Sequence, residues 1–122
     1  MNIAVVTGAS SGLGREYIHE INRRETDIAE IWAVARRQDR LEEVKNESAI
    51  PVRILPYDLT DQESISLIEN ELKQANPRVR LLINAAGLGK IGDYTAVSRT
   101  DADRMLDLNC RAAIALTYLC LP

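Results

Sequence analysis

Four short apolar runs alternate with longer segments of helical periodicity, and this alternation constrains the fold more than any other feature of the chain. The runs cover residues 3–7, 31–35, 52–56 and 79–84, and they are rich in Val and Ile. The first two are apolar on both faces, which is typical of parallel strands covered by helices on both sides. Because such alternation implies right-handed crossovers, the sequence predicts an α/β fold with a doubly wound parallel sheet of four strands.

The segments between the runs predict helices. A short helix is expected over residues 40–46 and a long last helix over residues 99–119. Asp61 and Asp101 lie near expected helix starts, where a carboxylate is favourable. The residues expected in the apolar stripes are Leu13, Tyr17, Ile18 and Ile21 in the first helix, Ile65, Ile68 and Leu72 in the third, and Met105, Asn109, Ala112, Leu116 and Leu119 in the last.

Length, charge and composition narrow the function classes. A chain of 122 residues makes a single domain, here residues 1–122, and its net charge of −3 offers no basic footprint for nucleic acid or an anionic membrane. No apolar run approaches the roughly 20 residues of a membrane span, and the N-terminus lacks the features of a signal peptide. We therefore expect a cytoplasmic protein with neither a nucleic-acid nor a membrane partner. Two cysteines without a C-x-x-C and a lone histidine, His19, predict no metal site.

All six glycines fall in two loops, one after the first predicted strand and one after the fourth. They are Gly8, Gly12 and Gly14 in the first loop and Gly87, Gly89 and Gly92 in the second. In a doubly wound sheet these two strands are neighbours where the strand order reverses, and ligands bind at the carboxyl ends of strands at that point. Glycines there let a ligand approach the backbone closely, which favours a binding crevice over merely flexible turns.

The spacing of the first loop, G-x-x-x-G-x-G, matches neither the G-x-G-x-x-G dinucleotide fingerprint nor the G-x-x-x-x-G-K-[ST] loop of nucleoside triphosphatases. The loop nevertheless directs a helix N-terminus, with its free N–H groups and partial positive charge, at the crevice, which suits a pyrophosphate. Ser10 and Ser11 add hydroxyl donors and Arg15 adds a cationic charge. Because no Lys follows the last glycine, the triphosphate interpretation is excluded and a dinucleotide remains.

The end of the second predicted strand bears on which dinucleotide is held. Arg36 lies 22 residues after Gly14 and is followed by Arg37, while Ala35 stands where a carboxylate for an NAD ribose would be expected. Arginine can bind a phosphate through two parallel hydrogen bonds, which suits the 2′-phosphate of NADP. This pattern favours NADP over NAD. The alternative is that the two arginines merely solvate a strand end.

With three further motifs, these residues resemble the short-chain dehydrogenases/reductases. The four motifs, in order, are TGASSGLG at residues 7–14, Asp58-Leu59, NAAG at residues 84–87, and Asn109. The resemblance extends over essentially the whole chain. It implies a Rossmann-like fold, of which this chain is the N-terminal, NAD(P)-binding part, and it makes T-G-x-x-x-G-x-G the usual cofactor turn.

The resemblance also implies roles for single residues. The cofactor-binding set would comprise Gly8, Ser10, Ser11, Gly12, Leu13 and Gly14 at the pyrophosphate, Arg36 and Arg37 at the 2′-phosphate, Asp58 and Leu59 at the adenine, and Asn84, Ala85, Ala86 and Gly87 beside the ribose. Ala85 departs from the family, which has a second Asn there. Asn109 would be catalytic, helping to hold a water in a proton relay; the alternative is a hydrogen bond between helices.

Members of this family use a Tyr with a Lys four residues later as the acid/base, together with a Ser that positions the substrate. None of the four tyrosines here has such a Lys. The resemblance therefore implies the cofactor-binding half of an NADP-dependent oxidoreductase, which moves a hydride between nicotinamide and a small carbonyl or alcohol substrate. We expect this chain alone to be inactive, and we expect a homo-oligomer because the fourth strand would form an exposed edge.

Two other interpretations remain open at this point. One is a non-catalytic NADP-sensing or scaffolding module with the same fold. The other is a different doubly wound domain, of the flavodoxin-like or signalling kind, which fold alone does not exclude but which Arg36, Asp58 and Asn84 do not suit. The residues present select no particular substrate.

Overall fold

Strands and helices alternate from β1 to β4, as the sequence predicts, and helical segments follow β4. The structure is a computed structural model, and it describes residues 1–24, 27–87 and 93–122. The elements are β1 (Asn2–Thr7), α1 (Gly12–Arg24), β2 (Glu30–Val34), α2 (Gln38–Glu47), β3 (Val52–Leu55), α3 (Gln62–Ala75), β4 (Arg78–Asn84), the short 3₁₀ helix η1 (Tyr94–Ala96), α4 (Arg99–Leu106), the π-helical turn η2 (Asp107–Ala112) and α5 (Ala113–Cys120). Each predicted strand is present to within a residue or two at its ends.

The four strands form one parallel sheet in the order β3-β2-β1-β4. β1 lies inside the sheet, where Val5 is in register with Trp32 of β2 and with Leu82 of β4. The chain builds outward from β1 to β2 and β3, and then returns to add β4 on the other side of β1. The predicted doubly wound parallel sheet is confirmed, and the order reverses between β1 and β4.

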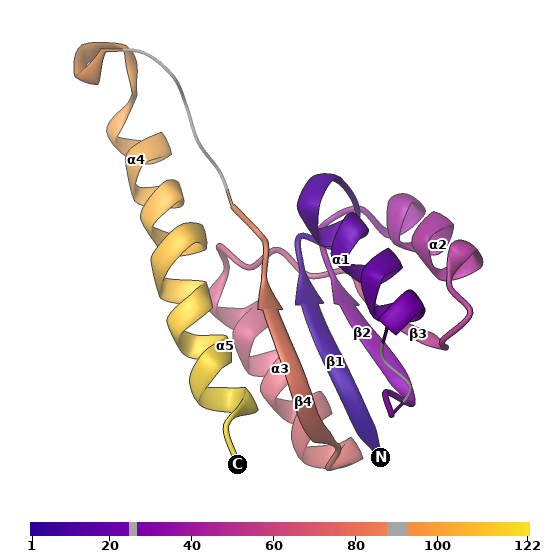
Figure 1. The fold of residues 1–122 in the computed structure, drawn as a ribbon. Coiled ribbons are helices and arrows are strands. Elements are labelled where there is room, and N and C mark those ends of the chain that lie inside the picture. The colour runs from indigo at the N-terminus through magenta and orange to yellow at the C-terminus, as the bar shows by residue number, and fades with distance from the viewer. Residues whose placement is uncertain (25–26, 88–92) are drawn as a thin grey trace.

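Helices cover both faces of this sheet (Figure 1), with α1 and α2 on one side and α3 and α5 on the other. Successive residues of a strand point to opposite faces. Accordingly, Ala4 and Val6 of β1 belong to the core under α1 and α2, whereas Ile3 and Val5 belong to the core under α3 and α5. This two-sided burial explains why β1 is apolar at each position from Ile3 to Val6.

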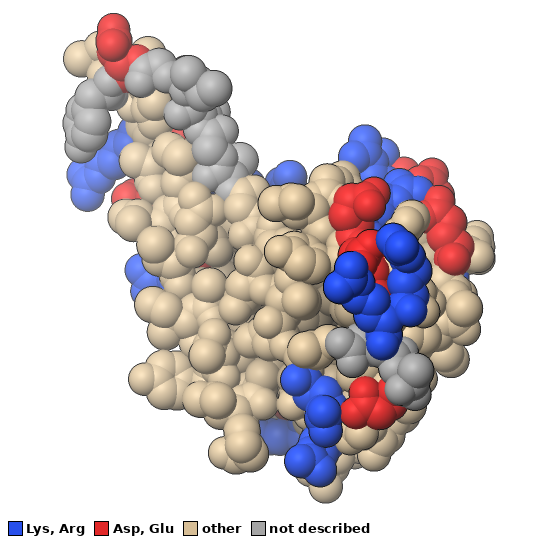
Figure 2. Space-filling model, in the orientation of Figure 1, with Lys and Arg blue, Asp and Glu red and all other residues tan. Residues whose placement is uncertain are grey.

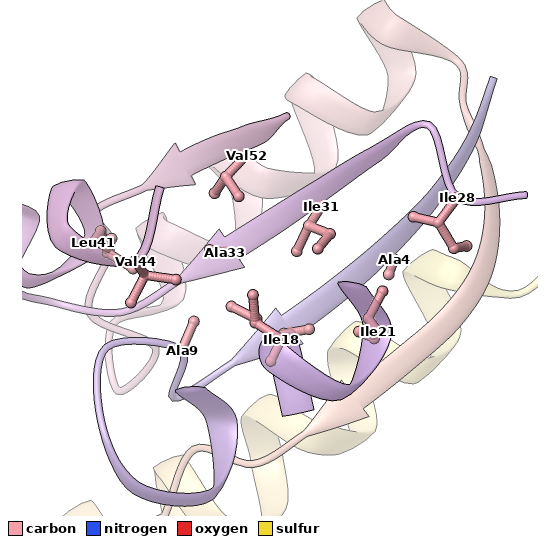
Figure 3. Close-up of a cluster of buried hydrophobic side chains, with 11 residues drawn as sticks. Ala4, Ala9, Ile18, Ile21, Ile28, Ile31, Ala33, Leu41, Val44 and Val52 are labelled. Carbon is pink, nitrogen blue, oxygen red and sulfur yellow. The ribbon is translucent and has the colours of Figure 1, made fainter. Parts of the chain in front are cut away.

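The core under α1 and α2 is built from aliphatic side chains. Ile18 and Ile21 of α1 lie over Ala4 of β1 and Ile31 and Ala33 of β2 (Figure 3). All five are 4% exposed or less. The buried apolar area anchors α1, and therefore the turn that precedes it, to the centre of the sheet.

Two residues expected in the α1 stripe are exposed, Leu13 at 72% and Tyr17 at 43%. The buried residues of α1 are Gly14, Ile18 and Ile21. These follow the i, i+4, i+7 spacing of one helix face. The sequence expectation is confirmed for Ile18 and Ile21 and wrong for Leu13 and Tyr17, because Gly14, which has no side chain to mark it as apolar, occupies the buried side of the first turn.

The last predicted helix is interrupted. α4 ends at Leu106, the π-helical turn η2 follows, and α5 continues from Ala113. The junctions keep right-handed helical backbone angles, so the three segments form one rod. A π turn adds a residue to the local period, and such turns are frequent at functional sites. Ala112 and Leu116 are buried as expected, but Asn109 is exposed.

The polar residues expected at helix starts are found there. Asp61 caps α3 by accepting a hydrogen bond from the Glu63 amide at 3.1 Å. Ser98 caps α4 by accepting from the Asp101 amide at 3.1 Å, and the Asp101 carboxylate lies in the first turn. Both arrangements satisfy amides that have no partner within the helix.

In the described part of the chain, none of the helices combines the length and apolar character needed to cross a membrane. Within those same ranges, no group of three or more His, Cys, Asp or Glu side chains could hold a metal ion. His19 lies on the surface beside Glu47, with 3.2 Å between Nε2 and Oε2. Cys110 and Cys120 are free thiols, and burial raises the pKa of Cys120 to about 11.

Candidate functional site

A pocket of about 370 Å³ opens at the carboxyl ends of the strands. It lies where β1, β2 and β4 end, at the reversal of strand order, so its position is the one that the glycine pattern predicts. The predicted cofactor residues that line it are Gly8, Ser10, Ser11, Gly12, Leu13, Arg36, Asp58, Leu59, Ala85, Ala86 and Gly87. Of the glycines in the second loop, Gly89 and Gly92 lie outside the described residues.

The turn between β1 and α1 requires glycine at two positions for different reasons. Gly8 has φ +62°, and a Cβ there would lie 2.8 Å from the Ala85 oxygen and the Ala86 nitrogen. Gly12 has φ +55°, but no atom lies within 4 Å of its Cβ position. Gly8 therefore lets the two loops touch, whereas Gly12 combines a left-handed backbone with open space on the pocket side.

Gly14 supports the turn and does not line the pocket. A Cβ on Gly14 would lie 2.0 Å from the Gly8 carbonyl oxygen and 3.0 Å from the Thr7 oxygen. The first turn of α1 is therefore packed directly against the end of β1. Its glycine is needed so that the helix N-terminus starts close to the strand.

Thr7 links the two loops of the pocket. It is 1% exposed, its hydroxyl accepts a hydrogen bond from the Ala86 amide at 3.0 Å, and it lies 3.5 Å from the Ile83 carbonyl oxygen. The sequence motifs did not indicate this role of Thr7. The sequence did contain one signal for it: Thr7 places a hydroxyl at the end of an otherwise apolar strand. A buried polar group needs a hydrogen-bond partner, so a contact with a neighbouring segment could have been expected.

Asp58 lies in the loop after β3 with its carboxylate oriented by Thr60. Oδ1 accepts from the Thr60 amide at 3.0 Å and from the Thr60 hydroxyl at 2.7 Å. Burial by itself would raise the pKa of Asp58. The two Thr60 hydrogen bonds and the charges of Arg36 and Arg104 outweigh that effect, so the pKa lies below its ordinary value. The pocket therefore contains an ionised carboxylate with a defined orientation.

The structure places Arg36 and Arg37, the two arginines predicted to bind the 2′-phosphate, in different surroundings. Arg36 lines the pocket. Arg37 pairs with Asp39 in the first turn of α2, with 2.9 Å between Nη2 and Oδ2, and it is absent from the pocket wall. The ion pair with Asp39 thus holds Arg37 away from the pocket wall, which Arg36 lines.

Arg15 also turns away from the pocket. It bonds to Glu47 and lies 3.8 Å from a Glu43 oxygen, so it bridges α1 to α2. The cationic charge expected beside the glycine turn is therefore committed to a contact between helices. The helix N-terminus with Ser10 and Ser11 is the part of this turn that could bind an anion.

The structure adds lining residues that the motifs did not indicate. Tyr57 and Thr60 flank Asp58, and Arg104 and Leu108 come from α4 and η2. Leu108 packs against the core cluster that contains Leu59. No local signal could have placed Arg104 at this site, because its position depends on how α4 extends beyond the sheet (Figure 1).

Asn84 and Asn109 lie beside the pocket and not in its wall. Asn84 is directed toward α5, with its Nδ2 atom 3.5 Å from the Thr117 hydroxyl. Asn109 lies next to the second loop, since its Oδ1 atom is 3.5 Å from the Cβ position of Gly87. The catalytic role of Asn109 stays a prediction.

The match to a family decides the class of this chain. A family model described as short chain dehydrogenase matches residues 2–122. The chain belongs to the short-chain dehydrogenase family. The resemblance carried by the four motifs is thereby confirmed, and the flavodoxin-like alternative is set aside.

Individual short-chain dehydrogenases are similar over nearly the whole chain. Sulfoacetaldehyde reductase of Chromohalobacter salexigens is 32% identical over 123 residues, which are 96% of this chain and 46% of that protein. A short-chain dehydrogenase from Sphingobium yanoikuyae, solved in complex with NADPH, has a TM-score of 0.84 and 29% identity, covering 98% of this chain and 47% of that one.

A more distant structure, 4-hydroxyisoleucine dehydrogenase complexed with NADH, has a TM-score of 0.83 and 23% identity, covering 97% of this chain and 47% of that one. At that identity the likeness shows the fold alone. Together these similarities confirm the Rossmann-like fold of the family. The chain spans about half the length of the relatives it matches.

Proposed function

We propose that this chain is the cofactor-binding part of an NADP-dependent oxidoreductase, which moves a hydride between nicotinamide and the carbon of a small carbonyl or alcohol. The observation that carries the proposal is the pocket at the reversal of strand order. It brings together the glycine turn, Arg36 and Asp58 from loops that follow three different strands. Such convergence is what a long, two-ended ligand such as a dinucleotide requires.

The residues present fit a pyrophosphate. Gly12 leaves open space at the N-terminus of α1, where free amides and the positive end of the helix favour an anion. Ser10 and Ser11 line the same part of the pocket and supply hydroxyl donors. When bound, the nicotinamide would supply or accept the hydride. Asn109, beside Gly87, would help to hold a water for proton transfer.

NADP is favoured over NAD by the end of β2. Ala35 and Arg36 both line the pocket, so a cation is present where an NAD-binding protein would use a carboxylate. Within the described ranges Arg36 forms no ion pair, so its guanidinium is available for a 2′-phosphate. The NADPH complex of the Sphingobium enzyme supports this assignment.

Isothermal titration of the chain with NADPH and with NADH tests the assignment. We expect tighter binding of NADPH. Arg36→Ala should weaken NADPH binding by roughly 10- to 100-fold, because a hydrogen bond to a charged group contributes about 1.5–3 kcal/mol, and it should change NADH binding little. Arg37→Ala is the matched control, since Asp39 already engages that side chain. Equal affinity of the unmodified chain for both cofactors would contradict the preference for NADP.

We also propose that this chain does not catalyse hydride transfer by itself. Its residues bind and orient a cofactor, but the chain contains no Tyr-x-x-x-Lys to act as acid and base. NADPH oxidation followed at the nicotinamide absorbance with a panel of aldehydes and ketones is expected to stay at the rate of the protein-free control. Turnover that depends on the chain would contradict this proposal.

Self-association is proposed from the surface around β4 and α5. β4 is an edge of the described sheet, and Ile114 and Tyr118 of α5 are exposed at 59% and 73%. Figure 2 shows that the surface over α5 and the middle of β4 carries few charged residues. Light scattering is expected to give more than the monomer mass of 13.6 kDa. A monomer at high concentration would contradict it. The cytoplasmic location stays a prediction.

A further inference from the structure

α4 contributes a wall of the pocket that none of the sequence motifs indicates. Arg104 and Leu108 line the pocket from this wall. They are four residues apart, so they lie on the same side of the helical rod. Leu108 is half-buried and packs against the core cluster under α3 and α5. This packing holds the side of the rod that carries Arg104 at the pocket.

Arg104 is an exposed residue that lines the pocket. Arg104 acts on the Asp58 carboxylate through space, as Arg36 does. In the part of the chain that the structure describes, neither guanidinium has an ion-pair partner within 4.0 Å. Arg111 of η2, by contrast, is bonded to Asp107 at 2.9 Å. Two available cations thus reach the same pocket from different elements.

Arg36 and Arg104 are placed to contact different parts of a bound dinucleotide. Arg36 follows β2, at the position that favours a 2′-phosphate. Arg104 lines the same pocket as Asp58, which the family resemblance makes the acceptor of the adenine amino group. A guanidinium is planar, donates through a fork of N–H groups and stacks on aromatic faces, so it suits a purine ring as well as it suits an anion.

We propose that Arg104 is a positioning residue for the adenosine end of the cofactor, holding the purine at Asp58 while Arg36 reads the 2′-phosphate. This inference rests on the proposed function. It predicts that Arg36 determines the preference for NADPH over NADH, whereas Arg104 contributes equally to the affinity for both cofactors. Leu108, on the same side of the rod, supplies an apolar surface next to Arg104.

The test compares the two arginines by isothermal titration with NADPH, NADH and adenosine 5′-monophosphate. Arg104→Ala is expected to weaken all three by about 3- to 30-fold, the range of a partly desolvated cation–π contact. Arg36→Ala is expected to weaken NADPH alone. Arg104→Lys keeps the charge but loses the planar fork, so it should recover only part of the affinity. Arg99→Ala removes the same charge from the exposed start of α4 and should change nothing.

Three outcomes would overturn the inference while the unmodified chain binds NADPH. Arg104→Ala could leave every affinity within twofold, it could weaken NADPH alone, or Arg99→Ala could weaken binding equally, which would indicate a general charge effect. A thermal melt shows whether Arg104→Ala remains folded, and Arg104→Gln, with a similar length of side chain, repeats the comparison if it does not. If the unmodified chain binds none of the three ligands, the proposed function itself fails.

Discussion

β1 and β4 are neighbouring strands, and each leads into a glycine-containing loop that forms one wall of the pocket. The two strands differ in how completely their side chains are buried. Ile3 to Thr7 of β1 are all buried, whereas in β4 exposed and half-buried residues alternate through its first half, and none is fully buried. β1 has a partner strand on each side and β4 has one. The wall after β1 is therefore fixed by a complete core. The wall after β4 depends on contacts that β1 supplies to it.

The helices over the two strands show the same difference. Ile18 and Ile21 of α1 are buried as members of the cluster in Figure 3, while in α5 Leu116 is buried and Ile114 and Tyr118 are exposed. Charged residues gather over α1 and α2, and the surface over α5 is largely uncharged (Figure 2). Stability should therefore be distributed unevenly between the two sides of the pocket.

The largest expected effect separates the two helices directly. Ile18→Ala should lower the free energy of unfolding by about 2–5 kcal/mol, because it leaves a cavity in a fully packed core. Ile114→Ala, on the exposed side of α5, should change the unfolding free energy of the monomer by less than about 0.5 kcal/mol. Urea unfolding measures both. A comparable loss in the two variants would mean that α5 is as well packed as α1, which would remove the contrast.

In the turn after β1, replacing Gly14 and replacing Gly12 should lower the free energy of unfolding by different amounts. Gly14→Ala should destabilise the chain by about 3 kcal/mol, because its Cβ would overlap the Gly8 carbonyl and the backbone would have to shift. Gly12→Ala meets no atom within 4 Å and should cost only the strain of a left-handed alanine, about 1–2 kcal/mol. Thermal unfolding of the pair is the measurement, and a larger loss for Gly12→Ala would show that the close packing of α1 on β1 is misplaced.

A single substitution can remove the hydrogen bond between the Thr7 hydroxyl and the Ala86 amide, which joins the loop after β1 to the loop after β4. Thr7→Val keeps the shape of the side chain but leaves the Ala86 amide without its acceptor, which should cost about 1–2 kcal/mol. Hydrogen exchange at the Ala86 amide should become faster in this variant. Thr7→Ser retains the hydroxyl and should preserve the protection of that amide. Unchanged exchange in Thr7→Val would show that β1 does not hold the second wall.

The smallest expected effect concerns pH. The pKa of Asp58 is depressed in the folded chain, so its carboxylate stabilises the fold above its unfolded value of about 3.9, and this contribution is lost as pH falls through the folded pKa. Between pH 5 and pH 3 the unmodified chain should therefore lose more stability than Asp58→Asn. Urea unfolding at each pH measures the difference, with Asp103→Asn as an exposed control on α4. Parallel pH profiles for the chain and Asp58→Asn would contradict the orientation of this carboxylate.

Much of the pocket was predictable because its signals are local. The glycines of the first turn, Arg36 and Asp58 each stand at the end of a run that the sequence marks as a strand, and strand ends of a parallel sheet converge. Leu13 and Tyr17 show the limit of the same reasoning: they are apolar enough to be expected in the buried stripe, but Gly14, which carries no apolar signal, takes the buried position in the first turn. The π turn at η2 was equally hidden, because it changes the helical period without changing composition.

The order of strands and helices, the point where the sheet reverses and the glycine turn at the pocket could be predicted from the sequence, since they follow from period, β-branching and the conformational freedom of glycine. Which arginines line the pocket depends on tertiary packing. Arg15 and Arg37 are engaged by Glu47 and Asp39, while Arg36 and Arg104 remain available to the pocket. An arginine's direction depends on the carboxylates that packing brings near it, and those come from elements that no short segment of sequence specifies.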